Sequence, residues 1–454
     1  MGFNTLLQLV GAVTYDQPWV MTTLFTLFYV LLGVRSLTQP VAAVVMYFGT
    51  VIMNPQNNYP ILMDIPLAKI MAGWCVLACL LNCGKLSFKF HPLLVLVLVF
   101  LLTANISAFY AVVPELAEKR FEEFNKVGIM LFVTIWAVNN RKDYEFLFWG
   151  LTGSFFYNIL KNLVQTQTKG RWVTVTGTAG WLGDSNDWAL ALAMALPLFY
   201  TALSLQWNRG WRSRLIFGIA TAGALLTLTM TSSRGGFLAA AIPGMIFLAM
   251  DRKPGRAALI ATLLAVVVSL YMPGAFLRKI ESLAGLSDKA TTTWSEGVAE
   301  NEEYTGAERI YYWKVATQIM QDHPLTGVGW GNFVKEFAKL ENLDEAPVAH
   351  STWFQVGSEA GITGLVAFLV MIFTSMCAIL SCWIGSRNIN DDWIQVHSRC
   401  ILIGIISFCI GGTFISREYS ELLFLYIAMS SILITIYKQQ RFQEPKSSKS
   451  YSLS

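Results

Sequence analysis

The ten residues Leu93–Leu102, LLVLVLVFLL, are all apolar. Similar runs recur along the chain, for example at Ala189–Leu203 and Ala257–Tyr271. Of the 454 residues, 54% are hydrophobic and only 14% are charged, whereas a soluble domain carries about 25% charged residues. Because a helix needs roughly 20 mostly apolar residues to cross a bilayer, the sequence predicts an all-α polytopic membrane protein.

The apolar segments predict about 12 transmembrane helices, since most of them are close to the length of a bilayer crossing. The first two segments are short for a full crossing. No basic region precedes the first of them, so we expect no removable signal peptide. The candidate segments are 20–34, 41–53, 64–82, 91–111, 122–138, 143–163, 185–205, 212–231, 234–250, 256–272, 358–385, 399–415 and 421–437.

The basic residues of the short loops give the orientation, because cytoplasmic loops are enriched in Lys and Arg. The alternate loops that carry Arg35, Arg141, Arg209 and Arg387 are expected on the cytoplasmic side of the membrane. The long polar interval then faces the opposite side. The predicted parts are an N-terminal transmembrane bundle (1–272), a large loop on that opposite side (273–357), C-terminal transmembrane helices (358–437) and a cytoplasmic tail (438–454).

The polar interval contains a helical pattern at residues 306–321, with apolar side chains on one face and an aromatic edge at Tyr311, Tyr312 and Trp313. This pattern predicts an amphipathic helix that lies on the membrane interface. The preceding residues 285–305 are polar and acidic and are expected to be mobile. A Gly-rich turn, HPLTGVGWGNF, follows at residues 323–333, and His350 comes just before the next apolar segment.

The chain lacks a P-loop and the GxGxxG, HExxH and GxSxG motifs, and its cysteines lie in or beside apolar runs. From these absences we expect that the protein uses no metal ion and no cofactor. An imidazole is the natural group to take a proton from a hydroxyl near neutral pH. His350 is therefore a candidate base, with a structural role as the alternative, whereas His323 precedes a proline and is better explained as a cap.

Arginines on the predicted non-cytoplasmic side suit a phosphate-bearing ligand, because guanidinium groups bind phosphate through two hydrogen bonds and stay charged. Arg234 lies between two apolar segments with no acidic neighbour in the sequence, and a cation placed there is a functional candidate. Each arginine taken alone could equally be an ion-pair or interface residue. Other basic residues on this side are Arg171, Arg309, Arg417 and Lys126. Lys119 and Arg120 are also on this side and could pair with the nearby acids Glu115, Glu118, Glu122 and Glu123.

Several motifs together resemble the O-antigen ligase/polymerase superfamily. They are SSRGG at residues 232–236, Arg309 with Trp313, the turn at 323–333, and His350 with EAGITG at 359–364. MNP at residues 53–55 and DSNDWALA at 184–191, with Pro197-Leu198, resemble the ligase branch found beside exosortase systems.

The resemblance implies a metal-independent glycosyltransferase with a GT-C-like multi-span fold. It implies a glycan on undecaprenyl diphosphate as the donor and a hydroxyl of lipid A-core sugar as the acceptor. His350 would be the general base of an inverting transfer. Arg234 and Arg309 would bind the diphosphate, with Arg171 as a weaker third; His323, Glu359 and Asp187 are possible supporting residues.

Three alternatives stay open beside an O-antigen ligase. A repeat-unit polymerase or a protein O-oligosaccharyltransferase would use the same donor chemistry. A lipid-linked glycan transporter would need inverted repeats and ionisable groups near the membrane midplane. The notable charges fall at one membrane surface instead, which disfavours the transporter, and nothing indicates a nucleic-acid partner.

Overall fold

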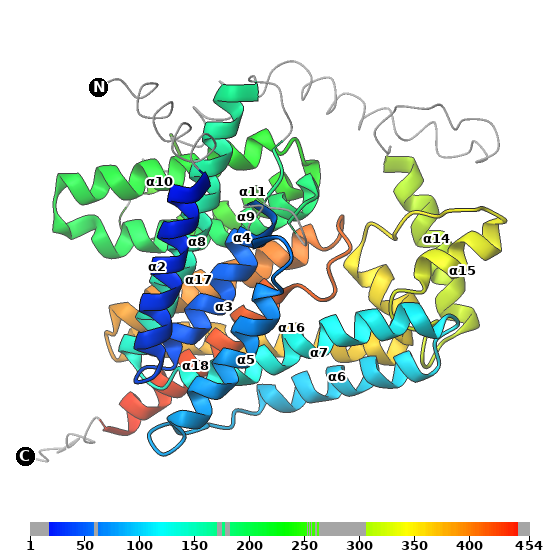
Figure 1. The fold of residues 1–454 in the computed structure, drawn as a ribbon, viewed down its shortest axis with the longest axis horizontal. Coiled ribbons are helices and arrows are strands. Elements are labelled where there is room, and N and C mark those ends of the chain that lie inside the picture. The colour runs from blue at the N-terminus through cyan, green and yellow to red at the C-terminus, as the bar shows by residue number, and fades with distance from the viewer. Residues whose placement is uncertain are drawn as a thin grey trace, which may run out of the picture.

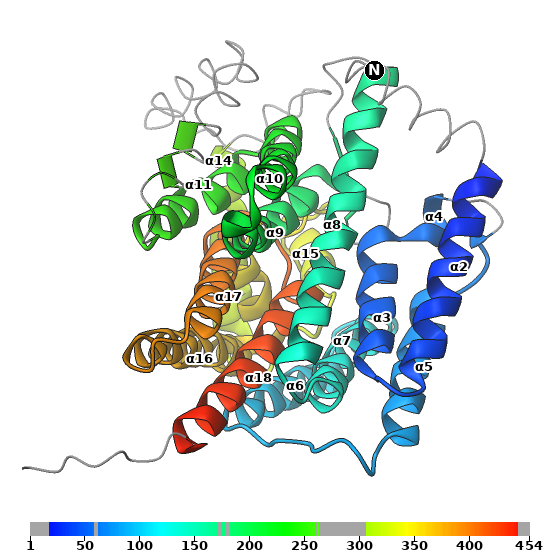
Figure 2. The same cartoon turned by 90° about the vertical axis from the view of Figure 1, so that its left-hand side faces the viewer.

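The computed structural model describes residues 18–58, 62–169, 175–177, 182–251, 253, 255, 257–258, 261–262 and 306–443. Every regular element in these ranges is helical (Figures 1 and 2). Arg171, most of the predicted segment 256–272 and the polar residues 285–305 lie outside them.

The helices coincide with the predicted apolar segments wherever both are described. The clearest difference is at the start of α7, which begins at Pro114 rather than near 122, because a proline in the first turn is preorganised for a helix. The helices are α2 (Pro18–Ser36), α3 (Val41–Met53), α4 (Pro55–Asn58), α5 (Leu67–Leu81), α6 (Leu93–Phe109), α7 (Pro114–Ala137), α8 (Arg141–Lys169), α9 (Ser185–Gln206), η3 (Trp207–Arg209), α10 (Trp211–Met230), α11 (Arg234–Ala249), α14 (Gly306–Asp322), α15 (Phe333–Glu341), α16 (Thr352–Asn388), α17 (Asp392–Gly411) and α18 (Glu421–Gln443).

Five of the described helices, α9, α10, α16, α17 and α18, are long and apolar enough to cross a membrane. Helices α3, α5, α6 and α11 and most of α2 are apolar but shorter. These helices support a multi-pass membrane protein, and the number of about 12 crossings stays a prediction.

Helix α9 lies at the centre of the bundle and packs against α10, α11 and α17. It is buried along almost its whole length, with Trp188 and Leu192 fully enclosed. Small residues allow the close approach of α11, because a Cβ on Gly236 would overlap the Cβ of Ala189. Close contact through small residues is the usual way in which helices pack inside a membrane.

Helices α14 and α15 form a separate packed unit at one end of the molecule (Figure 1). The apolar face of α14 is buried through Tyr312, Ala316 and Ile319, which pack with Phe333 and Phe337 of α15. The helix predicted at 306–321 is therefore confirmed, and its place on the membrane interface stays a prediction. Its apolar face, however, is buried inside the protein against α16 and against α15, a helix that the sequence did not predict.

Candidate functional site

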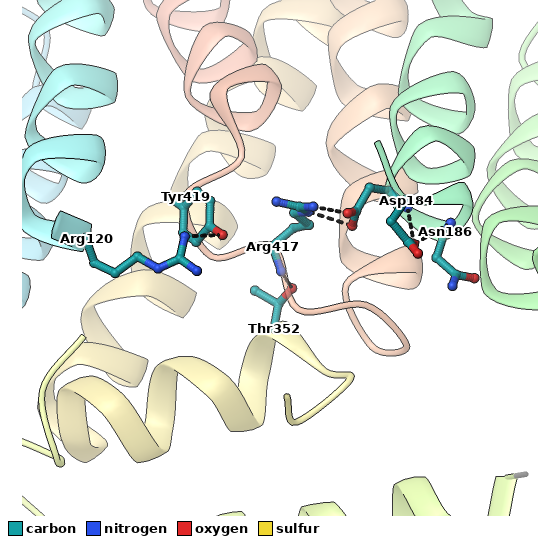
Figure 3. A network of polar contacts seen from close by, with 7 residues as sticks. Arg120, Asp184, Asn186, Thr352, Arg417 and Tyr419 are labelled. Carbon is teal, nitrogen blue, oxygen red and sulfur yellow. Dashed lines mark hydrogen bonds and ion pairs between the residues drawn. The ribbon is translucent and has the colours of Figure 1, made fainter. Parts of the chain in front are cut away.

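The loop between α17 and α18, residues 412–420, ties together several helix ends on one face of the bundle. Thr352, the first residue of α16, holds this loop at three points. Its backbone N–H donates to the carbonyl of Gly412 at 2.7 Å, and its hydroxyl donates to the carbonyl of Ile415 at 2.6 Å. The same hydroxyl accepts from the backbone N–H of Arg417 at 2.9 Å (Figure 3). The start of α16 and this loop therefore form one hydrogen-bonded unit.

An ion pair then joins the loop to α9. The Nε of Arg417 donates to Oδ1 of Asp187 at 2.5 Å, and its Nη2 contacts the second carboxylate oxygen. The two side chains are only 15% and 9% exposed. A two-point pair of this kind fixes orientation as well as charge. Asp187 was expected to support the site, and the structure gives it a partner that is remote in the sequence.

Asp184 caps the N-terminus of α9. Its Oδ1 accepts from the backbone N–H of Asn186 at 2.7 Å and of Asp187 at 3.4 Å. The side-chain oxygen of Asn186 in turn accepts from the hydroxyl of Ser233 at 2.7 Å, and Ser233 caps α11. The N-termini of α9 and α11 are thus linked, and Arg234 is the first residue of α11.

His350 is held in an unusual backbone conformation, with φ at +49°. For a residue with a side chain, the left-handed region costs about 1–2 kcal/mol. The amides on both sides hold it there: Ala349 donates to Oε1 of Gln355 at 3.0 Å, and Ser351 donates to the hydroxyl of Ser416 at 3.2 Å. Local strain maintained by its surroundings is common at functional sites.

The imidazole of His350 is neutral at neutral pH. Burial lowers its pKa, the guanidinium of Arg309 lowers it further, and the carboxylate of Asp184 opposes this, with a resulting pKa of about 4. The structure therefore brings Arg309 and Asp184 into the electrostatic field of His350. Trp313, on the same helix as Arg309, donates from Nε1 to the carbonyl of Ala349 at 3.1 Å and so positions α14 beside the histidine.

Glu359 lies inside α16, is 1% exposed, and acts on the site through Gln355. Its Oε1 accepts from Nε2 of Gln355 at 2.6 Å and from the backbone N–H of Phe333 at 3.3 Å. Because Gln355 also holds the amide before His350, this chain of contacts connects the histidine to the end of the Gly-rich turn. Glu359 thus positions Gln355 and the backbone of Phe333, and through Gln355 it supports the amide next to His350.

The Gly-rich turn fits against a break in α16 at Gly361, where φ is +70°. A Cβ at Gly361 would lie 2.5 Å from the carbonyl oxygen of Leu325, and one at Gly327 would overlap the backbone of Glu359. The N–H of Gly329 donates to the carbonyl of Glu359 at 3.0 Å. The glycines therefore serve close backbone packing.

The remaining predicted residues are less closely connected. His323 directly follows α14, and its backbone carbonyl accepts from the N–H of Gly327 at 3.1 Å, so its role as a cap stays a prediction. Arg234 is half-buried and pairs with no carboxylate of the described ranges. Arg171 lies outside the described residues.

Sequence reasoning missed the pairing of Arg417 with Asp187. In the sequence, Arg417 was recognisable only as a basic residue on an unexpected side of the membrane, and Asp187 only as an acidic residue in a motif. Asp184 likewise appeared only as the first letter of DSNDWALA. The expectation that Arg120 pairs with a nearby acid is confirmed, since its Nη1 lies 2.9 Å from Oε2 of Glu123. Within the described ranges, no three His, Cys, Asp or Glu side chains are grouped so that they could hold a metal ion.

Two family models match parts of the chain. Residues 219–369 match the model of the O-antigen ligase family, and this range includes Arg234, Arg309 and His350. Residues 20–173 match a family of unknown function, DUF5935. No curated protein matches the chain. The branch found beside exosortase systems stays a prediction, but the match over residues 219–369 confirms the wider resemblance to the O-antigen ligase superfamily.

Proposed function

We propose that the chain is an O-antigen ligase of the bacterial inner membrane. It moves a glycan from undecaprenyl diphosphate to a hydroxyl of lipid A-core oligosaccharide on the periplasmic face, with His350 as the general base. The observation that carries the proposal is the neutral, half-buried imidazole of His350 beside the cation Arg309. A base and a fixed positive charge are the two groups that this transfer requires.

The leaving group explains why one base is enough. A sugar diphosphate departs readily, so the site does not need the acid and base carboxylate pair of a glycosidase. Negative charge develops on the departing diphosphate, and preorganised cations stabilise it. Arg309 lies beside His350, and Arg234 is joined to the same region through Ser233, Asn186 and Asp184.

Donor binding would also prepare the base. Arg309 lowers the pKa of His350 in the free protein. A bound diphosphate offsets the charge of Arg309, so the pKa of His350 rises toward its ordinary value near 6.5. The carboxylate of Asp184 then stabilises the imidazolium that forms when the acceptor hydroxyl gives up its proton. The site thus becomes a stronger base once the donor is in place.

The stereochemical outcome follows if the acceptor attacks opposite the diphosphate. The attacking oxygen then forms its bond to the anomeric carbon as the bond to the diphosphate oxygen breaks, and the anomeric configuration inverts. The anomeric configuration of the product tests this directly, and retention contradicts a single displacement.

The central test is transfer by purified protein in lipid vesicles. We expect His350→Ala to lower the rate by at least about 100-fold, since general base catalysis contributes roughly that much or more. His323→Ala is the matched control and should transfer at close to the wild-type rate. Arg234→Ala and Arg309→Ala should weaken donor use more than acceptor use. A His350→Ala protein that still transfers removes this residue from the mechanism.

A repeat-unit polymerase of the same superfamily is distinguished by the glycolipids of a cell that lacks the protein. Bare lipid A-core with long polymer stranded on the carrier indicates a ligase. Lipid A-core bearing a single repeat indicates a polymerase.

A further inference from the structure

A large polar cavity borders the Arg417–Asp187 ion pair, since Arg417 is one of its lining residues. Its volume is about 540 Å³, and its walls come from the ends of α3, α5 and α7, the α17–α18 loop and the start of α18. This volume is within the range of about 300–1,000 Å³ that is typical of small-ligand pockets. Its charged lining residues are Arg120, Glu123, Lys126, Arg417 and Glu421.

The cations of this cavity already have carboxylate partners. Arg120 pairs with Glu123 at 2.9 Å, and Nζ of Lys126 lies 3.6 Å from Oε1 of Glu421. Arg120 also donates to the hydroxyl of Tyr419 at 2.7 Å. The cavity therefore offers many donors and acceptors with little net charge, which suits the hydroxyl groups of a sugar better than a diphosphate.

Arg234 differs from these residues because no carboxylate of the described ranges pairs with it. A diphosphate gains most from a cation that is not already neutralised. The two regions thus suit different parts of the substrates: the region of Arg234 and Arg309 suits the diphosphate, and the cavity suits uncharged sugar.

The α17–α18 loop connects the cavity to the candidate base. Figure 3 shows Arg417 between Tyr419 and Asp184, with the start of α16 directly beneath it. The backbone N–H of Arg417 binds Thr352, two residues after His350. On α9, Asn186 accepts a hydrogen bond from Ser233 at the start of α11, whereas Asp187 pairs with Arg417, which lines the cavity. The cavity therefore reaches the site through Arg417, whereas Arg234 is linked to the site through Asn186 and Ser233.

We propose that this cavity binds the sugars of the acceptor glycan, the molecule that supplies the attacking hydroxyl. This inference rests on the proposed function and adds the place of the second substrate. An attack opposite the diphosphate requires the acceptor to enter away from the diphosphate-binding arginines, and neither Arg234 nor Arg309 lines the cavity. Lys126 and Glu421 are the expected specificity residues, since both line the cavity and they pair with each other rather than with Arg417 or Asp187.

The test measures transfer by full-length protein in vesicles, varying each substrate while the other is saturating. Glu421→Gln and Lys126→Gln should raise the KM for lipid A-core about tenfold or more and leave the KM for the donor unchanged. Glu122→Gln is the matched control, because Glu122 lies on the same helix as Lys126 and forms an exposed pair with Lys69. Ala68→Phe, which fills the cavity without removing a charge, should raise the same KM.

Two outcomes overturn the proposal. An increase in the donor KM alone assigns the cavity to the donor. Unchanged constants in all three cavity variants make the ion pairs purely structural. If the glutamine variants fail to fold, Ala68→Phe decides between these results.

A binding measurement separates this proposal from the proposed function. Soluble core oligosaccharide, freed of its lipid, should bind His350→Ala protein as it binds wild type, and more weakly to the Ala68→Phe protein. If wild type neither binds this oligosaccharide nor transfers to it, both proposals fail. If wild type transfers while Ala68→Phe keeps full affinity, only the cavity proposal fails.

Discussion

The charges around His350 predict two variants that move its pKa in opposite directions. Arg309 lowers the pKa and Asp184 raises it, and burial makes the largest contribution. Arg309→Gln should therefore raise the pKa of His350, and Asp184→Asn should lower it. Asparagine also caps helices well, so Asp184→Asn should leave the start of α9 intact.

The magnitude follows from the position of the pKa. The interval between the ordinary value near 6.5 and about 4 corresponds to about 3 kcal/mol, at about 1.4 kcal/mol for each pH unit. Burial accounts for the largest part, so removing Arg309 should recover only part of the interval. We expect a rise of about one pH unit, or about 1.4 kcal/mol.

The assay is the pH dependence of kcat/KM for transfer, because this quantity reports the pKa of the free protein. Wild type should keep its activity down to about pH 4 on the acid side. The acid limb should move up in Arg309→Gln and down in Asp184→Asn. If the acid limbs of the two variants move in the same direction, or if neither limb moves, the acid limb does not report His350 under the influence of Arg309 and Asp184.

Folding stability carries the same dependence with a defined sign. Between pH 6.5 and 4 the unfolded imidazole binds a proton while the folded one does not, so the free energy of unfolding falls as pH is lowered through this window. The loss is at most about 3 kcal/mol, reduced by solvent screening of the half-buried ring. Above pH 6.5 His350 contributes no pH dependence.

Two further predictions concern the supports of the site. Asp187→Ala should lower the free energy of unfolding by about 3–5 kcal/mol, because it strands the guanidinium of Arg417 in a largely buried place, and a second change, Arg417→Met, should recover part of this loss in denaturant unfolding. If Arg417→Met recovers none of the lost free energy of unfolding, the stranded guanidinium of Arg417 is not the cause of the loss. Gly361→Ala should lower the thermal midpoint, since φ is +70° and the new Cβ would meet the carbonyl oxygen of Leu325. Gly73→Ala, in open space on α5, is the control, and equal midpoints for the two variants would contradict the packing argument.

The sequence predicted the helices well because the length of an apolar run is a local property. It also predicted that Arg120 pairs with a nearby acid, since such partners are close along a helix. It could not identify Asp187 as the partner of Arg417, because only the packing of α9 against the α17–α18 loop brings them together. The burial of α14 was missed for the same reason: α15, which covers its apolar face, was read as part of a loop.

The break at Gly361 separates two mechanical tasks within α16. Residues 352–360 are anchored to the α17–α18 loop and the Gly-rich turn, while residues 362–388 form the long apolar part. A thicker or thinner bilayer changes the tilt of a spanning helix. We expect this break, which the Gly-rich turn fills, to absorb the change of tilt before it reaches the imidazole, so the transfer rate should vary little between vesicles of short-chain and long-chain lipids. A steep dependence on chain length would show that the break transmits the motion.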